Sequence, residues 1–282
     1  MRAGTGARLF GITALVLGFS FLYLPIVLLV ISSFNASKLT MVWAGFSTRW
    51  YGELFRDKQI LTAVWVSLRI AFWTASAATV IGTMAAIAMT RFRHFPGRTL
   101  FGLLVTAPLV MPEVILGLSV LLMLVSASAI FGTPSKGMVA IWIAHVTLTV
   151  SIVTVVMTAR LSDLDRSLEE AAMDLGANRL RVFFWVTLPL IAPSLISSWL
   201  LAFTLSLDDV VVASFLTGPD STTLPVKVFA SVRRGISPMI NALATLMILL
   251  VSLAAAIGGW LMIRRDKQLR RDARILLRSE SN

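Results

Sequence analysis

Cysteine is absent from all 282 residues of the chain. That absence excludes disulfide bonds, a thiolate nucleophile and a cysteine-ligated metal site. It also means that cysteine usage does not indicate whether the protein resides in an oxidising or a reducing compartment. The P-loop pattern G-x-x-x-x-G-K-[ST] is also missing, because the nearest candidate, Gly132–Gly137, is followed by Met138 instead of lysine. The chain is therefore not expected to bind ATP through a P-loop.

Catalytic constellations are equally scarce. The zinc-protease pattern H-E-x-x-H does not occur, and the two histidines, His94 and His145, are expected in a loop and in an apolar segment, without a metal-ligand set. Asp208 and Asp209 are adjacent, but neighbouring side chains on a helix point about 100° apart and do not share a proton as an aspartyl dyad must. We therefore predict no enzymatic activity and no cofactor.

Charge is low for a chain of this length. Only 14% of the residues are charged and 57% are hydrophobic, which is too apolar for a soluble protein. The formal net charge is +11, yet the basic residues stand beside apolar segments, as orientation signals of membrane proteins do. This composition predicts an integral membrane protein and argues against nucleic acid as a partner.

Six segments are apolar and long enough to cross a bilayer as helices, which takes about 20 residues each. The predicted fold is therefore all-α and integral to the membrane, with six transmembrane helices in one domain, 1–282. The apolar run Val210–Leu216 is a candidate re-entrant segment. The predicted spans are Leu9–Ile31, Leu61–Met89, Leu100–Val125, Met138–Ala159, Phe184–Leu207 and Met239–Ile263.

The distribution of Lys and Arg predicts the orientation. With the N-terminus inside, sixteen of the 25 basic residues fall on the inner side, eight fall outside, and Arg69 lies within the second span. This excess favours both termini in the cytoplasm. The basic tail 264–282 then fits an anchor attracted to anionic lipid, with a specific partner site as the alternative.

A polar loop, about 160–183, separates the fourth and fifth spans. Ser167 and Glu170 match the S-x-x-E capping box, Gly176 suits the left-handed turn that ends a helix, and Asn178 suits the cap of the next helix. The loop should therefore form a compact helical knob that fits a partner's groove. One face of the knob collects Leu168, Ala171, Ala172 and Leu175.

The same stretch carries a family motif. It reads Glu170-Ala171-Ala172, three residues, Gly176, nine residues, Val186, one residue and Leu188-Pro189. This pattern resembles the EAA motif of ABC importer permeases, with valine in place of isoleucine. The resemblance implies the ABC type-1 importer permease fold and a loop that couples to cytoplasmic ATPase subunits. The coupling residues that it implies are Glu169, Glu170, Ala171, Ala172, Asp174, Gly176, Leu188 and Pro189.

Acidic residues within or beside the spans are candidates for the substrate pathway. Glu113 follows Pro112 inside the third predicted span, where a carboxylate needs a cavity or a partner. It either lines the pathway or forms an ion pair, for example with Arg69 or with another subunit. Asp208 and Asp209 end the fifth span, and they either line the pathway, sit at the interface or cap the next helix.

Aromatic side chains extend this pathway hypothesis. Trp199 and Phe203 stand at i and i+4, so their rings are able to present faces to an ammonium group. Ordinary packing is the alternative for such a pair. Acidic and aromatic groups together favour a cationic solute.

Further segments resemble polyamine importer permeases, namely Leu205–Phe215, Thr223-Leu224-Pro225, Ser237-Pro238 and Ile240–Thr245. The resemblance implies a multi-pass protein of the bacterial inner membrane that carries putrescine, with spermidine or another small organic cation as the alternative. It also implies a second homologous permease, two ATP-binding subunits and a periplasmic binding protein. A secondary transporter driven by an ion gradient has no need of the knob, and a membrane enzyme lacks its catalytic residues here.

Overall fold

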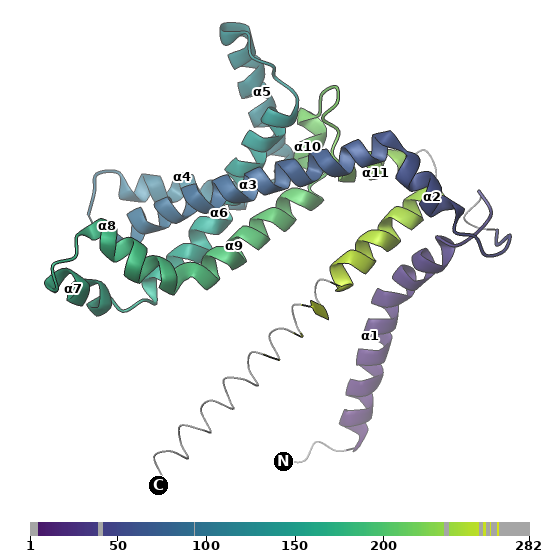
Figure 1. Ribbon diagram of the computed structural model, residues 1–282, viewed down its shortest axis with the longest axis horizontal. Helices are drawn as coiled ribbons and strands as arrows, with labels where there is room; N and C mark the ends of the chain where they lie inside the picture. Colours follow the sequence, from purple (N-terminus) through teal and green to yellow (C-terminus); the bar gives the residue numbers. More distant parts are fainter. Residues whose placement is uncertain are drawn as a thin grey trace. The chain divides into compact units, whose positions relative to one another are not determined.

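The computed structural model describes residues 5–38, 42–92, 94–233 and 237–253, together with 256, 257, 260 and 264. The described residues form helices and one isolated β-bridge, which confirms the predicted all-α class (Figure 1). The chain divides into two compact units, Met1–Asp57 with Ser231–Asn282, and Lys58–Ala230. The second unit contains the predicted coupling and pathway residues.

The first unit contains α1 (Thr5–Ser32), α2 (Arg49–Arg56) and the apolar helix Pro238–Leu253. Asn35 organises the loop between α1 and α2. Its side-chain oxygen accepts the amide N–H groups of Ser37 (3.1 Å) and Ala44 (3.0 Å), and its amide nitrogen donates to the carbonyl of Val42 (2.7 Å). The indole N–H of buried Trp50 donates to the Asn35 carbonyl (2.7 Å), so α2 is tied to this loop.

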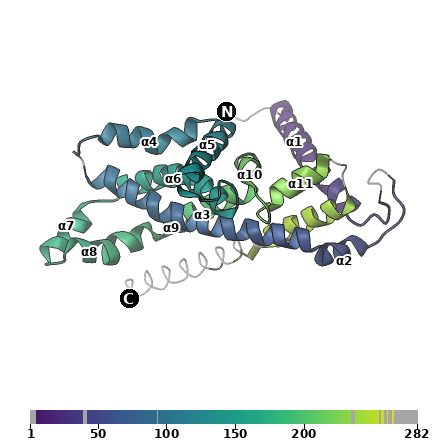
Figure 2. The same ribbon diagram turned by 90° about the horizontal axis from the view of Figure 1, so that it is seen from above.

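The second unit is built around three long helices, α3 (Lys58–Arg91), α6 (Met138–Ser162) and α9 (Leu188–Asp208), which contact one another and lie side by side in both views (Figures 1 and 2). The helix α4 packs along α6, and α10 packs against α5. The other elements of this unit are α4 (Arg98–Val110), α5 (Glu113–Phe131), α7 (Ser167–Asp174), α8 (Arg179–Val182), the π-helix η1 (Phe183–Thr187), α10 (Val211–Leu216) and most of α11 (Leu224–Arg233), whose residues after Ala230 belong to the first unit.

Small residues let α3 and α6 approach closely. A Cβ atom at Gly82 would lie 2.8 Å from Val153 Cγ1 and 3.1 Å from the carbonyl oxygen of Val150, so only glycine fits there. Close backbone approach of this kind is how helices associate within a membrane, where dispersion replaces the hydrophobic effect. The buried alanines of α3 include Ala71, Ala75, Ala78 and Ala86.

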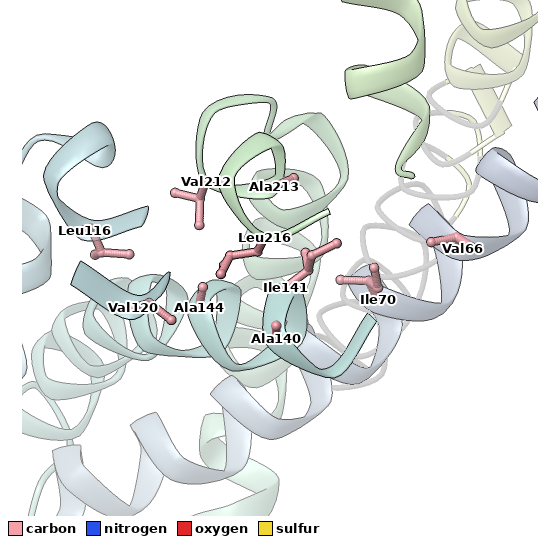
Figure 3. Close-up of a cluster of buried hydrophobic side chains, with 10 residues drawn as sticks. All are labelled: Val66, Ile70, Leu116, Val120, Ala140, Ile141, Ala144, Val212, Ala213 and Leu216. Carbon is pink, nitrogen blue, oxygen red and sulfur yellow. The ribbon is translucent and has the colours of Figure 1, made fainter. Parts of the chain in front are cut away.

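An apolar cluster covers one face of the short helix α10 (Figure 3). A Cβ at Gly117 of α5 would lie 3.0 Å from Phe215 Cδ2 and 3.2 Å from the Cα of Val212, so α10 is in close contact with α5 at this glycine. Four elements contribute the cluster, namely Val66 and Ile70 from α3, Leu116 and Val120 from α5, Ala140, Ile141 and Ala144 from α6, and Val212, Ala213 and Leu216 from α10.

Five described helices are long and apolar enough to cross a membrane, namely Arg8–Ser32, Lys58–Arg91, Glu113–Phe131, Met138–Ser162 and Arg179–Asp208. The prediction of one continuous third span, 100–125, is wrong. Pro112 has no N–H and pushes Met111 out of the helical region (ψ 135°), so α4 ends before it and α5 begins after it. The sixth predicted span begins in Pro238–Leu253, and its remainder, to Ile263, falls largely outside the described residues.

Candidate functional site

The knob between α6 and α9 consists of α7, α8 and η1, and it lies at one end of the three long helices (Figure 1). The knob begins at Asp165, whose carboxylate accepts the Ser167 amide N–H (2.9 Å). This bond, together with one to the Ser167 hydroxyl, lowers the pKa of Asp165. The predicted Ser167–Glu170 capping box is therefore wrong. The N-cap residue is Arg166, which has no side-chain cap bond, and the Asp165 carboxylate just before it accepts the first N–H of the helix, where the helix dipole favours negative charge.

The helix α7 ends at the left-handed turn predicted for Gly176. Gly176 adopts φ +87°, its N–H donates to the carbonyl of Met173 (2.9 Å), and the N–H of Ala177 donates to that of Ala172 (3.1 Å). This pair of bonds is the Schellman motif, which satisfies the last carbonyls of a helix. Asn178 then caps α8 by accepting the Arg181 amide N–H (2.9 Å). Two sharp helix ends thus fix the outline of the knob.

Glu169 fastens the knob to the long helices. Its Oε1 accepts Arg91 Nη2 from the end of α3 (2.8 Å) and the Thr187 hydroxyl from η1 (2.8 Å). Arg91 Nη1 also donates to the carbonyl of Leu161 in α6 (3.2 Å). Both charged side chains are only 18% exposed, so this is a charge-assisted network with little solvent screening. Glu169 is therefore turned into the scaffold rather than toward a partner.

The π-helix η1 brings Thr187 to Glu169. Leu188 N–H donates to the carbonyl of Phe183, five residues earlier, which widens the helix by one residue. Pro189, next in the chain, lacks an N–H and so supports the altered hydrogen bonding at the start of α9. Leu188 packs against the apolar cluster that includes Met157 and Ile191. Its position indicates a structural role at the far end of the knob.

The other predicted coupling residues form an exposed surface. Glu170, Ala171 and Asp174 are exposed, Ala172 is half-buried, and α7 buries none of its residues within the described part of the chain. Leu175 is 89% exposed next to them. A helix this short, with its small and apolar face open, has the shape and chemistry to enter a groove.

The structure separates the two adjacent aspartates. Asp209 caps α10 by accepting the amide N–H groups of Val212 (3.3 Å) and Ala213 (2.7 Å), and its Oδ2 lies 3.2 Å from His145 Nε2. His145 Nδ1 lies 2.8 Å from the Ser206 hydroxyl. A carboxylate accepts only, so the ring donates to Asp209 from Nε2, while Nδ1 shares a hydrogen bond with the Ser206 hydroxyl. His145 and Ser206 are buried polar residues that the sequence alone did not join to Asp209.

Asp208 and Glu113 are both exposed. Asp208 is the last residue of α9, and Glu113 is the first residue of α5, where the helix dipole favours a carboxylate. The described residues supply no ion-pair partner for Glu113, and Arg69 does not reach it. Neither carboxylate forms an ion pair among the described residues.

Trp199 and Phe203 form part of the contact between α9 and α3. Their rings stack at 5.3 Å, and Phe72 of α3 meets Trp199 edge-on at 5.7 Å. The Trp199 indole N–H donates to the Ser76 hydroxyl (3.2 Å). Both side chains are half-buried, so packing accounts for one side of the pair and the other side stays accessible.

Residues 78–271 match the family described as the binding-protein-dependent transport system inner membrane component. The chain belongs to this family. The membership confirms the family that the EAA motif predicted. The matched region contains the knob, α6, α9 and the C-terminal part of α3.

Two curated relatives cover nearly the whole permease. The putrescine transport system permease protein PotI of Escherichia coli (strain K12) is 56% identical over 262 residues, which is 93% of each chain. The spermidine/putrescine transport system permease protein PotC of Haemophilus influenzae is 38% identical over 248 residues, which is 88% of this chain and 94% of the relative. Both relatives are transport permeases.

Solved structures support the fold. A bacterial ABC transporter involved in the import of the acidic polysaccharide alginate contains a chain that superposes with a TM-score of 0.69 at 18% identity, covering 92% of this chain and 98% of the other. An amino acid ABC transporter matches with a TM-score of 0.52 at 16% identity, over 74% and 96% of the two chains. The fold is that of ABC importer permeases.

Proposed function

We propose that this permease is a membrane subunit of an ATP-driven polyamine importer, with putrescine as the first expected cargo. The observation that supports the cargo most strongly is the 56% identity to a putrescine permease over 93% of both chains. The exposed carboxylates of Glu113 and Asp208 suit a polycation, and Trp199 and Phe203 offer aromatic faces for cation–π contact. Spermidine is the second candidate, supported by the 38% identical relative.

The knob is the proposed contact with the ATP-binding subunits. Glu170, Ala171 and Asp174 are exposed, while Glu169 ties α7 to η1 within the knob and ties the knob to α3 through Arg91, which also bonds α6. A rigid attachment of this kind transmits motion of the ATPases to the long helices and so rearranges the pathway. A second permease, two ATP-binding subunits and a periplasmic binding protein complete the proposed importer. A secondary transporter gains nothing from this knob.

Cargo is tested by reconstituting the complete importer with its binding protein and measuring ATP hydrolysis against each polyamine. We expect putrescine to stimulate hydrolysis several-fold more than spermidine at matched concentrations. A monovalent amine of similar length serves as the control and should stimulate little. Stimulation by neither polyamine would contradict the proposed cargo.

Orientation gives a separate prediction. We propose six spans with both termini in the cytoplasm, supported by the excess of basic residues on one side. Topology reporters placed after Arg93, after Arg179 and at the C-terminus should read cytoplasmic, and one after Arg56 should read periplasmic. Arg93 and the C-terminus fall outside the described residues. A periplasmic reading at Arg179 would remove the knob from the ATPases and refute the coupling proposal.

A further inference from the structure

His145 of α6 bonds the chain on both sides of the point where α9 ends. Its Nδ1 lies 2.8 Å from the hydroxyl of Ser206, in the last turn of α9, and its Nε2 lies 3.2 Å from the carboxylate of Asp209, just after that helix. The side chains of His145 and Asp209 are only 2% and 6% exposed. A buried titratable group in a membrane-spanning helix is costly, so its partners point to its role.

The α9–α10 joint, residues 206–210, is a break in the helical backbone. Asp209 leaves the helical region (φ −64°, ψ 128°), and α10 begins two residues later. The α10 side of the joint is held by the Asp209 cap and by apolar packing on α3, α5 and α6. Among the described residues, His145 makes all the side-chain hydrogen bonds between this joint and helices other than α9 and α10. The ring is therefore the polar contact that fixes the end of α9 against α6.

Asp208 lies on the opposite side of this joint. It follows Ser206 by two residues, which is about 200° around a helix, so the two side chains point in nearly opposite directions. Ser206 is buried against His145, whereas Asp208 is exposed. A rotation of the helix end that breaks the bond between Ser206 and His145 therefore also redirects the Asp208 carboxylate.

We propose that His145 is a positioning residue for cargo selection: by bonding Ser206 and Asp209, it fixes the direction of Asp208 and so the length of the diamine that the permease prefers. The inference rests on the proposed function, in which Asp208 attracts an ammonium group of the cargo. A diamine carries two such groups at a separation set by its chain, so each needs a partner at the matching distance. A shift of one carboxylate changes which chain length fits, without removing the attraction for positive charge.

Two amide substitutions separate the two bonds of the ring. The side-chain nitrogen of glutamine falls near the place of Nε2, so His145→Gln keeps a donor to Asp209. The side-chain nitrogen of asparagine falls near the place of Nδ1, so His145→Asn keeps the contact with Ser206 and leaves the buried Asp209 carboxylate without that donor. Val153→Ala, two turns later on α6, is the matched structural control, because it removes buried methyl groups that pack against α3.

The first measurement is the preference for putrescine over the diamine that is one methylene longer. It is the ratio of the concentrations that half-maximally stimulate ATP hydrolysis by the complete reconstituted importer. A site that discriminates one methylene does so about tenfold, and His145→Asn should reduce that ratio to about twofold. His145→Gln and Val153→Ala should keep the ratio, although Val153→Ala lowers the unfolding temperature. An unchanged ratio in His145→Asn, with an unfolding temperature that falls as in Val153→Ala, would show that the ring only fills the core.

The second measurement follows the position of residue 208 without cargo. The chain lacks cysteine, so Asp208→Cys supplies its only thiol. The rate at which a maleimide labels this chain in the complete importer should change several-fold when His145→Asn is added, and should stay the same with His145→Gln or Val153→Ala. Equal rates in all of these backgrounds would overturn the proposal, because the position of residue 208 would then not depend on the ring.

Ser206→Ala decides the question if His145→Asn does not assemble. It removes one partner of the ring and leaves the Asp209 cap intact, so it should change the labelling rate and lower the diamine ratio; no change in either would contradict the proposal. Stimulation by neither diamine, with a labelling rate that responds to the ring, would reject the proposed cargo and keep His145 as the residue that places position 208. Normal stimulation with no response of the ratio or the rate would do the reverse.

Discussion

Glu170→Lys should strip the ATP-binding subunits from the purified importer, or leave them attached with ATP hydrolysis independent of cargo. Glu170 is exposed on α7 and reversing its charge alters the docking surface without touching the scaffold. Gly176→Val should give the same result by a different route, because Gly176 has φ +87° and a β-branched residue there costs about 1–2 kcal/mol. That strain is small for a membrane bundle but large for a helix two turns long.

Glu169→Gln is the matched control on the neighbouring residue. Glu169 accepts Arg91 and Thr187 and is largely covered, so its neutralisation weakens charge-assisted bonds inside the scaffold. We expect a lower thermal unfolding temperature of the permease itself, with partial loss of coupling as a consequence. Leu188→Ala should be milder for coupling than either surface change.

The measurement is co-purification together with cargo-stimulated ATP hydrolysis in reconstituted vesicles. Normal stimulation in both Glu170→Lys and Gly176→Val would show that the knob is only a well-capped loop. Glu170→Lys should not lower the unfolding temperature as much as Glu169→Gln does. An equal fall would contradict the placement of Glu170 on the docking surface and of Glu169 in the scaffold.

Local chemistry decided which features were predictable from sequence. Gly176 and Asn178 are turn and cap residues whose hydrogen bonds lie within a few positions, so their roles followed from spacing. Asp165 was missed because Ser167 fits the cap pattern equally well. Only the folded backbone shows that the Asp165 carboxylate accepts an N–H at the start of α7. Pro112 was noted, yet the apolar run across it masked the break between α4 and α5.

Contacts between residues far apart in the chain could not be predicted from the sequence. Arg91 and Glu169 are 78 positions apart, and His145 and Asp209 are 64 apart, so no periodicity joins them. Glu169 and Glu170 read alike in the motif, and only the fold shows that one faces inward and the other outward. The sequence had offered a cap as one alternative for Asp208 and Asp209, and the structure gives that position to Asp209 alone.

Asp208→Asn should reduce polyamine uptake roughly tenfold while the importer assembles normally. Asp208 is exposed at the end of α9, and the substitution removes a negative charge with almost no change in shape. A loss of about 1.4 kcal/mol in attraction for a cation corresponds to that factor. Glu113→Gln, at the start of α5, should act in the same direction. Uptake assays and co-purification are measured on the same preparations.

Asp209→Ala provides the structural counterpart one residue away. It leaves α10 without its cap and His145 without an acceptor in a buried site, a combined loss of roughly 3 kcal/mol or more. We therefore expect poor yield and a lower unfolding temperature rather than a selective transport defect. Asp208→Ala should unfold at the normal temperature. If Asp208→Asn and Glu113→Gln both transport at normal rates, the exposed carboxylates do not attract the cargo, and the cation pathway must be sought on other residues.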